Sequence, residues 1–335
     1  MKFSVDNAPH WLGAEPVAVM MRRVLYALIP VILVSTWMLG PGTIINLIFA
    51  ALACWCLEVL ALKLRNRPVQ AFASDGSVLI TACLLALALP PNTPWWVTAV
   101  ACLFAVVFAK HLYGGLGYNV FNPAMVGYVV VLISFPEQLS AWPGMGNPSL
   151  GLEKAFGAFF QGNLALDTLS GATPLDTIRI QLNNRLTMNE VINSPEFDNS
   201  GWILINLSAL AGGAWLLRRN VIRWHIPFAM LGALALLYSL FWIFADQSHA
   251  DPLFGLFSGG TMLAAFFVAT DPVSAASSDR GRLIYGAGIG VLTFVIREWG
   301  AYPDGIAFAV LLMNMAAPLI DRYTVPRVYG HRERP

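Results

Sequence analysis

The stretch SDGSVLITACLLALAL, residues 74–89, decides how this chain folds. Its apolar part, residues 77–89, makes about 20 Å of helix, whereas the hydrocarbon core of a membrane is about 30 Å thick. The preceding residues 71–76 are expected to dip into the membrane as non-helical backbone, which is tolerated only where protein or a cavity satisfies its polar groups. The sequence therefore predicts a short helix that starts inside the membrane.

A second stretch, SGGTMLAAFFVAT at residues 258–270, has the same character and follows the non-helical residues 253–260. Ser77 and Thr261 are expected to be helix N-caps near the middle of the membrane. Two helix starts at this depth, Gly76-Ser77 and Gly260-Thr261, would offer free N–H groups and partial positive charge to an electron-rich ligand. The alternative is that both segments are ordinary short or tilted spans.

Apolar runs bounded by Gly, Pro or charge predict ten membrane segments in all. They cover residues 24–39, 43–62, 77–89, 95–109, 120–135, 202–217, 224–244, 260–270, 283–299 and 305–320. One long polar insertion separates the first five from the last five. The expected fold class is therefore an all-α polytopic membrane protein, divided into a five-helix half (1–135), a periplasmic insertion (136–201) and a second five-helix half (202–335).

An odd number of spans in each half means that, if the halves are homologous, the second enters the membrane upside down. Sparse sequence matches support such an inverted repeat. Residues 74–77 resemble residues 258–261 at an offset of 184, and Lys110 and Phe121 match Arg297 and Phe308 at an offset of 187.

The basic residues predict the orientation, because Lys and Arg beside membrane spans are retained in the cytoplasm. Sixteen of the 20 Lys and Arg lie at the termini or at the segment ends away from the insertion. Both termini are therefore expected to be cytoplasmic, and residues 136–201 are expected to be periplasmic.

Composition excludes several classes of function. Hydrophobic residues make up 57% of the chain, charged residues 12%, and mean hydropathy is +0.63. A net charge of +1 leaves no basic excess for nucleic acid, so no nucleic-acid partner is expected. The four cysteines all lie in apolar runs without a C-x-x-C pair, which argues against a disulfide framework, a zinc site or an iron–sulfur cluster.

The insertion contains the string DTLSGAT, residues 167–173. Small residues before Thr173 leave its hydroxyl uncrowded, and Ser170, Gly171 and the following Pro174 favour a turn from which that hydroxyl can project. A bare threonine hydroxyl is a weak nucleophile, and no basic residue adjoins it in the sequence. Thr173 is therefore expected to accept a modification made by another enzyme, although such strings also occur in plain surface turns.

At this point the chain resembles a known family. The string D-x-x-S-G-A-T is similar to the motif in which a flavin transferase joins FMN to the last threonine through its phosphate. The rest of the chain is similar to the RnfD and NqrB family of membrane subunits, which belong to the Rnf electron-transport complex and to the sodium-translocating NADH:quinone reductase. Residues 121–124 (FNPA) and 269–274 (ATDPVS) carry part of this resemblance.

The resemblance implies that Thr173 is the FMN phosphoryl threonine and that Asp167, Ser170, Gly171 and Ala172 complete the flavinylation motif. It implies a membrane subunit of an ion-translocating electron-transport complex in the cell inner membrane, inactive alone and coupled to Na⁺ or H⁺ movement. The implied partners are the other subunits, a flavin transferase and membrane lipid. A second, non-covalent flavin such as riboflavin, or an ion path, is expected at the residues Gly76, Ser77, Gly260, Thr261 and Asn122.

Two rivals remain open from the sequence. A secondary transporter or channel for a small solute uses the same inverted architecture, and a structural scaffold would leave the motif without a role. NADH oxidation and iron–sulfur transfer are expected to belong to partners, because the chain has no dinucleotide-binding motif and no cysteine cluster.

Other polar and aromatic residues receive structural interpretations. Glu58 lies inside an apolar run and could mark an ion path, but we expect it to reach toward the boundary at Lys63. Asn122, before Pro123, could line a site or simply start a helix. Four tryptophans at predicted outer boundaries are expected to be interface anchors, namely Trp95, Trp96, Trp202 and Trp299.

Overall fold

The computed structural model of this chain describes residues 17–144, 151–161, 170–194, 197–245, 249–300, 302 and 304–325. Within these residues the protein is nearly all helical. Its described strands are two short ones, β1 (Trp142–Pro143) and β2 (Ser170–Gly171), which pair in an antiparallel ladder.

The two sets of membrane helices follow the same order along the chain. Each set has two long helices, a short segment that begins abruptly, a further helix and a last helix. The first set is α1 (Val17–Leu39), α2 (Gly42–Leu64), α3 (Val69–Ala73), α4 (Ser77–Ala88), α5 (Trp95–Leu103) continued by the π-helical η1 (Phe104–His111), and α6 (Pro123–Ser134). The second is α11 (Ser200–Arg218), α12 (His225–Ala245), α13 (Pro252–Phe257), α14 (Thr261–Leu263) continued by η3 (Ala264–Val268), α15 (Asp279–Trp299) and α16 (Ile306–Thr324).

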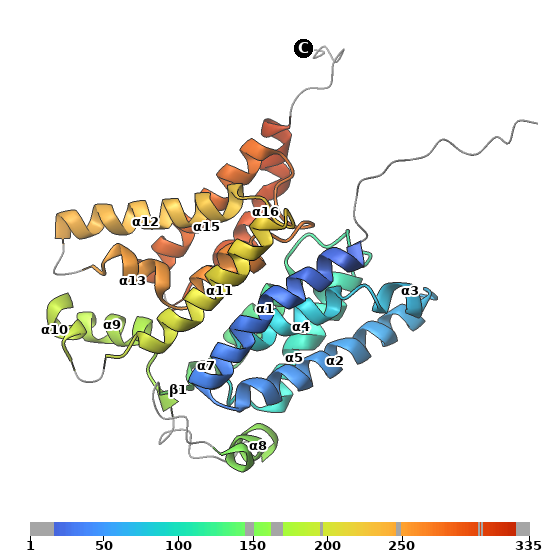
Figure 1. Cartoon of the computed structure of the whole chain (residues 1–335), viewed down its shortest axis with the longest axis horizontal. Coiled ribbons are helices and arrows are strands. Elements are labelled where there is room, and N and C mark those ends of the chain that lie inside the picture. Colours follow the sequence, from blue (N-terminus) through green and yellow to red (C-terminus); the bar gives the residue numbers. More distant parts are fainter. Residues whose placement is uncertain are drawn as a thin grey trace, which may run out of the picture.

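The insertion between the two sets is a chain of short elements. They are α7 (Pro136–Ser140), β1, α8 (Leu152–Gln161), β2, α9 (Pro174–Asn183) and α10 (Met188–Ile192). Figure 1 shows these elements along one side of the molecule, whereas the first residues of α1 and the last residues of α16 lie on the opposite side. The insertion packs on the bundle at two places, because α8 contacts α2 and residues of α9 join a buried cluster with residues of α12 and α15.

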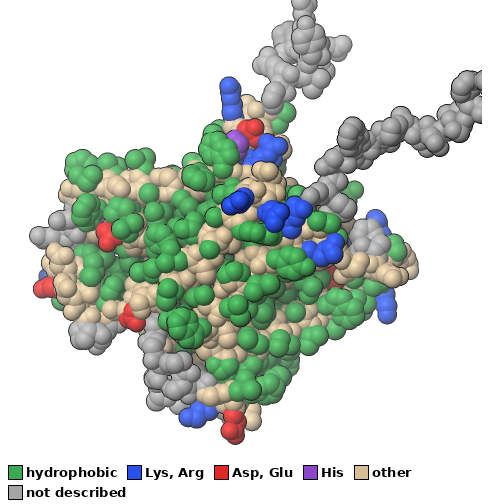
Figure 2. All heavy atoms as spheres, viewed as in Figure 1, with side chains coloured by type: hydrophobic (Ala, Val, Ile, Leu, Met, Phe, Trp, Pro, Cys, Tyr) green, Lys and Arg blue, Asp and Glu red, His purple; other side chains and the backbone are tan. Residues whose placement is uncertain are grey.

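The outer surface identifies the chain as a multi-pass membrane protein. Five helices are long and apolar enough to cross a membrane, namely α1, α2, α11, the residues 225–244 of α12, and α16. Large apolar side chains such as Trp37, Leu52 and Ile243 are exposed on these helices. Figure 2 shows hydrophobic side chains spread over the face in view. Such a surface is stable against lipid and would be a liability in water.

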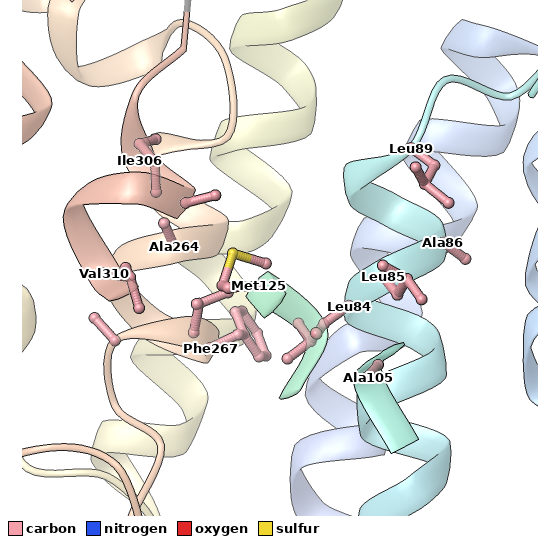
Figure 3. Packing of buried hydrophobic residues seen from close by; sticks show 14 of the residues in the cluster. Leu84, Leu85, Ala86, Leu89, Ala105, Met125, Ala264, Phe267, Ile306 and Val310 are labelled. Atoms are coloured by element: carbon pink, nitrogen blue, oxygen red, sulfur yellow. The ribbon is translucent and has the colours of Figure 1, made fainter. Parts of the chain in front are cut away.

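The core lies where the two helix sets meet. In α11, Gly212 faces α1 so closely that a Cβ at this position would lie 2.3 Å from the carbonyl oxygen of Ala27. Small residues allow membrane helices to approach in this way. Figure 3 shows Met125 of α6 beside Phe267 and Ala264 of the second set. The core is therefore continuous between the halves, whose exact division at residues 135 and 201 stays a prediction.

The broken helices start one residue later than predicted. Gly76 and Gly260 are the N-caps, and Ser77 and Thr261 are the first helical residues of α4 and α14. Gly76 has a φ of 84°, a left-handed conformation that glycine adopts without steric cost. The chain can therefore turn sharply at this glycine before α4 begins.

Candidate functional site

Thr173 is the N-cap of α9, the helix that covers the second half of the bundle. Its hydroxyl accepts a hydrogen bond from the backbone N–H of Asp176 at 3.2 Å, which is the usual bond of a threonine cap. The same hydroxyl donates to the Asp176 carboxylate at 2.5 Å. Both bonds fix the position of the hydroxyl at the predicted modification site.

The strand pair holds the backbone just before this threonine. Gly171 lies opposite Trp142, and Ser170 lies opposite Pro143. A Cβ on Gly171 would lie 2.8 Å from the Cα of Gly144, so only glycine fits here. Ala172 is exposed. The glycine of the motif therefore has a packing role within this protein.

Asp176 is a residue that the sequence interpretation missed. Its carboxylate is the acceptor that touches the hydroxyl of Thr173. Burial raises the pKa of the Asp176 carboxyl, and the hydrogen bonds with Thr173 oppose this rise. The signal was present as T-x-x-D, a threonine followed three residues later by an acid, which resembles a capping box.

A cavity of about 330 Å³ opens beside Thr173. Its lining comes from the insertion and from both helix sets, which meet around it. Aromatic side chains supply much of the wall, namely Tyr128, Trp142, Trp202 and Tyr302. This places Trp202 inside the protein, in edge contact with Trp142 at 5.1 Å, so the prediction of an interface anchor is wrong for Trp202.

The start of the second broken helix forms another part of this cavity wall. Gly260 lines the cavity, and its N–H donates to the carboxylate of Asp304 at 3.1 Å. Asp304 also lines the cavity and forms an ion pair with Arg297 at 3.2 Å. An acid therefore satisfies the N–H that the sequence left free for a ligand.

Arg297 holds this helix start from behind. Its guanidinium donates to the hydroxyl of Thr261 at 2.9 Å and to the carbonyl of Gly255 at 2.9 Å. The Thr261 hydroxyl in turn donates to the carbonyl of Ser258 at 2.8 Å. Thr261 is completely buried by these contacts, so its hydroxyl does not line the cavity.

The first broken helix has an equivalent arrangement. Lys110 donates to the hydroxyl of Ser77 at 3.0 Å, and the N–H of Ser77 donates to the Asp75 carboxylate at 2.7 Å. Lys110 also forms a buried ion pair with Glu58 at 2.8 Å, and His111 contacts the other oxygen of Glu58 at 2.8 Å. The prediction that Glu58 reaches toward the membrane boundary is wrong, because its charge is compensated inside the bundle.

The structure does not bring the two helix starts together. Gly76 and Ser77 belong to the Lys110 cluster and do not line the cavity beside Thr173. Gly260 lines that cavity instead. Among the described residues, no hydrogen bond or ion pair joins the two clusters.

Asn122 has a structural task between the halves. Its side chain accepts from the N–H of Met125 as the N-cap of α6 and donates to the carbonyl of Val268 at 3.2 Å. Its own N–H donates to Asn314 of α16 at 3.0 Å. Asp167 lies outside the described residues, and Ser170 is placed only by its backbone.

The fold and site define a class of protein: an integral membrane protein with two sets of five helices, a broken helix in each set, and a capped threonine above a cavity shared by both sets. Within this class the chain belongs to the NQR2, RnfD, RnfE family, whose family model matches residues 4–330. The resemblance seen in the motifs is thereby confirmed.

Several proteins from bacteria are similar to the chain over nearly its whole length. A Pseudomonas aeruginosa protein is 51% identical over 334 residues, covering 98% of this chain and 96% of that protein. A Shewanella denitrificans protein is 48% identical over 347 residues, covering 99% of each chain. An Escherichia fergusonii protein is 46% identical over 351 residues, covering 99% of this chain and 100% of that protein. Each is named as the D-type subunit of an ion-translocating oxidoreductase complex.

Proposed function

We propose that this chain is a membrane subunit of an ion-translocating oxidoreductase complex, and that it carries FMN covalently on Thr173. Its relatives bear the name of such a subunit, which supports the first part of the proposal. The second part rests on one observation of this chain: the Thr173 hydroxyl lies on the wall of an aromatic cavity.

The cavity suits the flat ring system of a flavin. Its volume of about 330 Å³ falls within the range of small-molecule sites, which are mostly apolar with a few polar groups. Tyr128 and Trp202 offer aromatic faces and edges against which a planar ring can pack. The attachment point and the space for the ring are therefore adjacent.

The chain's own residues would hold and shield the group. A bound flavin supplies one-electron and two-electron transfer, and the protein sets its surroundings. Apolar side chains such as Leu263 and Ile306 exclude water from the cavity, and the Asp304 carboxylate gives it one polar wall. Thr173 fixes the end of the group from which the ring must reach.

The remaining parts of the proposed function follow from the family and the charge pattern. Electrons would pass between this subunit and its partners with movement of Na⁺ or H⁺ across the cell inner membrane. The insertion would be periplasmic and both termini cytoplasmic, since the basic residues gather at the segment ends away from the insertion. Attachment would need a flavin transferase on the periplasmic side.

The attachment test uses two threonines of the same insertion. Thr187 caps α10 with a hydroxyl that also donates to an acid, Glu190, at 2.8 Å. We expect in-gel flavin fluorescence of the denatured wild type and of Thr187→Ala when a flavin transferase is co-expressed. Thr173→Ala should be dark although it inserts normally, and peptide mass spectrometry should place the FMN mass on Thr173. A labelled Thr173→Ala protein would refute the proposal.

The orientation test uses exposed positions on opposite sides of the bundle. We expect an impermeant thiol reagent to label Asn193→Cys in cells with a permeable outer membrane, and to label Arg67→Cys only after the inner membrane is broken. The reverse pattern would invert the orientation. Both variants need a background in which Cys56, which is exposed on α2, is replaced.

A further inference from the structure

A second cavity, of about 510 Å³, lies between the insertion and the second helix set. One wall is formed by α9 and the residues that follow it, and the other by the ends of α12 and α15 and by the start of α13. Leu175 contributes to both cavities, and the Arg297–Asp304 ion pair lies between them, with Arg297 in this lining and Asp304 in the first. The second cavity is therefore a separate space with its own chemistry.

Positive charge dominates the polar part of this lining. Three arginines contribute, but Arg297 is committed to Asp304, and the one lining acid, Glu298, lies 3.6 Å from His249. Arg179 and Arg185 form no ion pair within 4 Å with a described residue. Two arginines thus face the cavity with their charge left over.

Arg179 supplies the most direct sign of a missing partner. Its Nη2 donates to the carbonyl of Gly300, which fixes the guanidinium. Its Nη1 is buried and has no hydrogen-bond partner among the described residues. A buried donor without an acceptor costs about 1–3 kcal/mol, and more when it is charged. An anion in the cavity would remove this cost.

The other walls of the cavity are apolar. Ile178, Leu182 and Leu186 line it from the insertion, and Phe254 lines it from α13. The last turn of α12 beside it exposes Ile243 by 70% and Phe244 by 80%, as expected for residues that face lipid. Trp299, at the end of α15 in the lining, is 62% exposed. The cavity therefore lies at the level where the membrane meets water.

We propose that this cavity binds the phosphate of an anionic phospholipid, with Arg179 and Arg185 as the ligands of that phosphate. Guanidinium groups match phosphate geometry and form strong charge-assisted hydrogen bonds with it. The apolar walls accommodate the glycerol and the first carbons of the acyl chains. A lipid bound in this way ties the insertion, through α9, to the helices of the second set.

The test compares two lipids that differ only in charge. Full-length protein is delipidated, mixed with phosphatidylglycerol or phosphatidylcholine of the same acyl chains, and examined by native mass spectrometry. We expect wild type to retain phosphatidylglycerol in preference. Arg185→Asn should lower this retention about tenfold, the size of one lost charge-assisted hydrogen bond. Asparagine is chosen because Arg185 has a φ of 66°, which asparagine tolerates.

Two further variants protect the interpretation. Arg218→Gln, which removes an exposed arginine at the end of α11, should leave the lipid preference unchanged. Arg179→Lys keeps the charge and should retain more phosphatidylglycerol than Arg179→Gln. Equal lipid retention in Arg185→Asn and Arg218→Gln would overturn the proposal.

A last arm identifies the source of the anion. Inorganic phosphate is added to delipidated protein at matched ionic strength, and the unfolding temperature is measured. If inorganic phosphate stabilises the wild type but not Arg185→Asn, while the phosphatidylglycerol preference is missing, the ligand is a soluble anion and the lipid proposal fails. A cross-link from Asn183→Cys to an acidic segment of another protein of the complex, again without a lipid preference, would assign the arginines to a protein partner and overturn the proposal as well.

Discussion

The Nζ of Lys110 lies 2.8 Å from the Oε1 of Glu58, and both side chains are almost fully buried within the bundle. Charges taken out of water are stable only when they are paired and hydrogen-bonded, and each partner here has a further contact, Lys110 with Ser77 and Glu58 with His111. The pair therefore joins α2, η1 and the start of α4 into one unit.

Removing one partner of this pair should be more harmful than removing both. Lys110→Met leaves the Glu58 carboxylate buried without its main compensation, and we expect it to lower stability by about 3–5 kcal/mol. The double variant Glu58→Gln/Lys110→Met should recover part of this loss. Thermal unfolding in detergent measures both. Arg223→Ala breaks an exposed ion pair with Asp279 and should have little effect; equal losses in Lys110→Met and Arg223→Ala would contradict the account.

Gly212→Ala should loosen the contact between the halves. The new Cβ would lie 2.3 Å from the carbonyl oxygen of Ala27, so α1 and α11 would have to separate. We expect a loss of about 1–3 kcal/mol, typical of overpacking, and a lower unfolding temperature in detergent. Gly232→Ala in α12 meets nothing within 4 Å and should be neutral or slightly stabilising. A destabilised Gly232→Ala with an unaffected Gly212→Ala would speak against this contact.

Gly171→Ala should disturb the threonine site without a change in the threonine itself. A methyl group here would lie 2.8 Å from Gly144, so β1 and β2 must move apart. We expect less flavin per protein after co-expression with a flavin transferase, as measured by in-gel fluorescence. Gly157→Ala in α8, where a Cβ meets nothing, is the matched control and should label normally. Full labelling of Gly171→Ala would show that the strand pair is not needed.

The packing of α9 should depend on pH through Asp176. Burial raises the pKa of this carboxyl in the folded protein above its unfolded value. The protonated acid therefore favours the folded state, and this contribution is lost as pH rises through the folded pKa. We expect protein without flavin to unfold at a lower temperature above that pH than below it. Asp176→Asn should remove this part of the pH dependence, and an unchanged profile in Asp176→Asn would exclude Asp176 as its source.

The sequence predicted the helices well because membrane segments carry a strong local signal. The ten predicted segments match the helices of the two sets, and both short segments begin at the expected glycines. Even the match between Lys110 and Arg297 acquires a physical meaning, since each donates to the first hydroxyl of a broken helix. A shared structural task explains why these basic residues recur at equivalent positions.

The contacts around the sites could not be predicted in the same way. Glu58 and Lys110 are 52 residues apart, and an apolar run with one acid gives no indication of a distant partner. The role of Asp304 also depends on tertiary packing, because it reaches back to the N–H of Gly260. Asp176 is different, since its spacing from Thr173 was a local capping signal that could have been used.

Thr173 caps α9 with the same oxygen that FMN would esterify. An ester oxygen keeps its lone pairs but has no proton, so after attachment it can still accept from the N–H of Asp176 and can no longer donate to the Asp176 carboxylate. The helix start would survive the chemistry, while the acid would lose its donor and face a phosphate diester of the same sign. Attachment would thus turn a satisfied carboxylate into one that must take up a proton or swing away, so that the labelled and unlabelled forms of the protein differ at Asp176 as well as at Thr173.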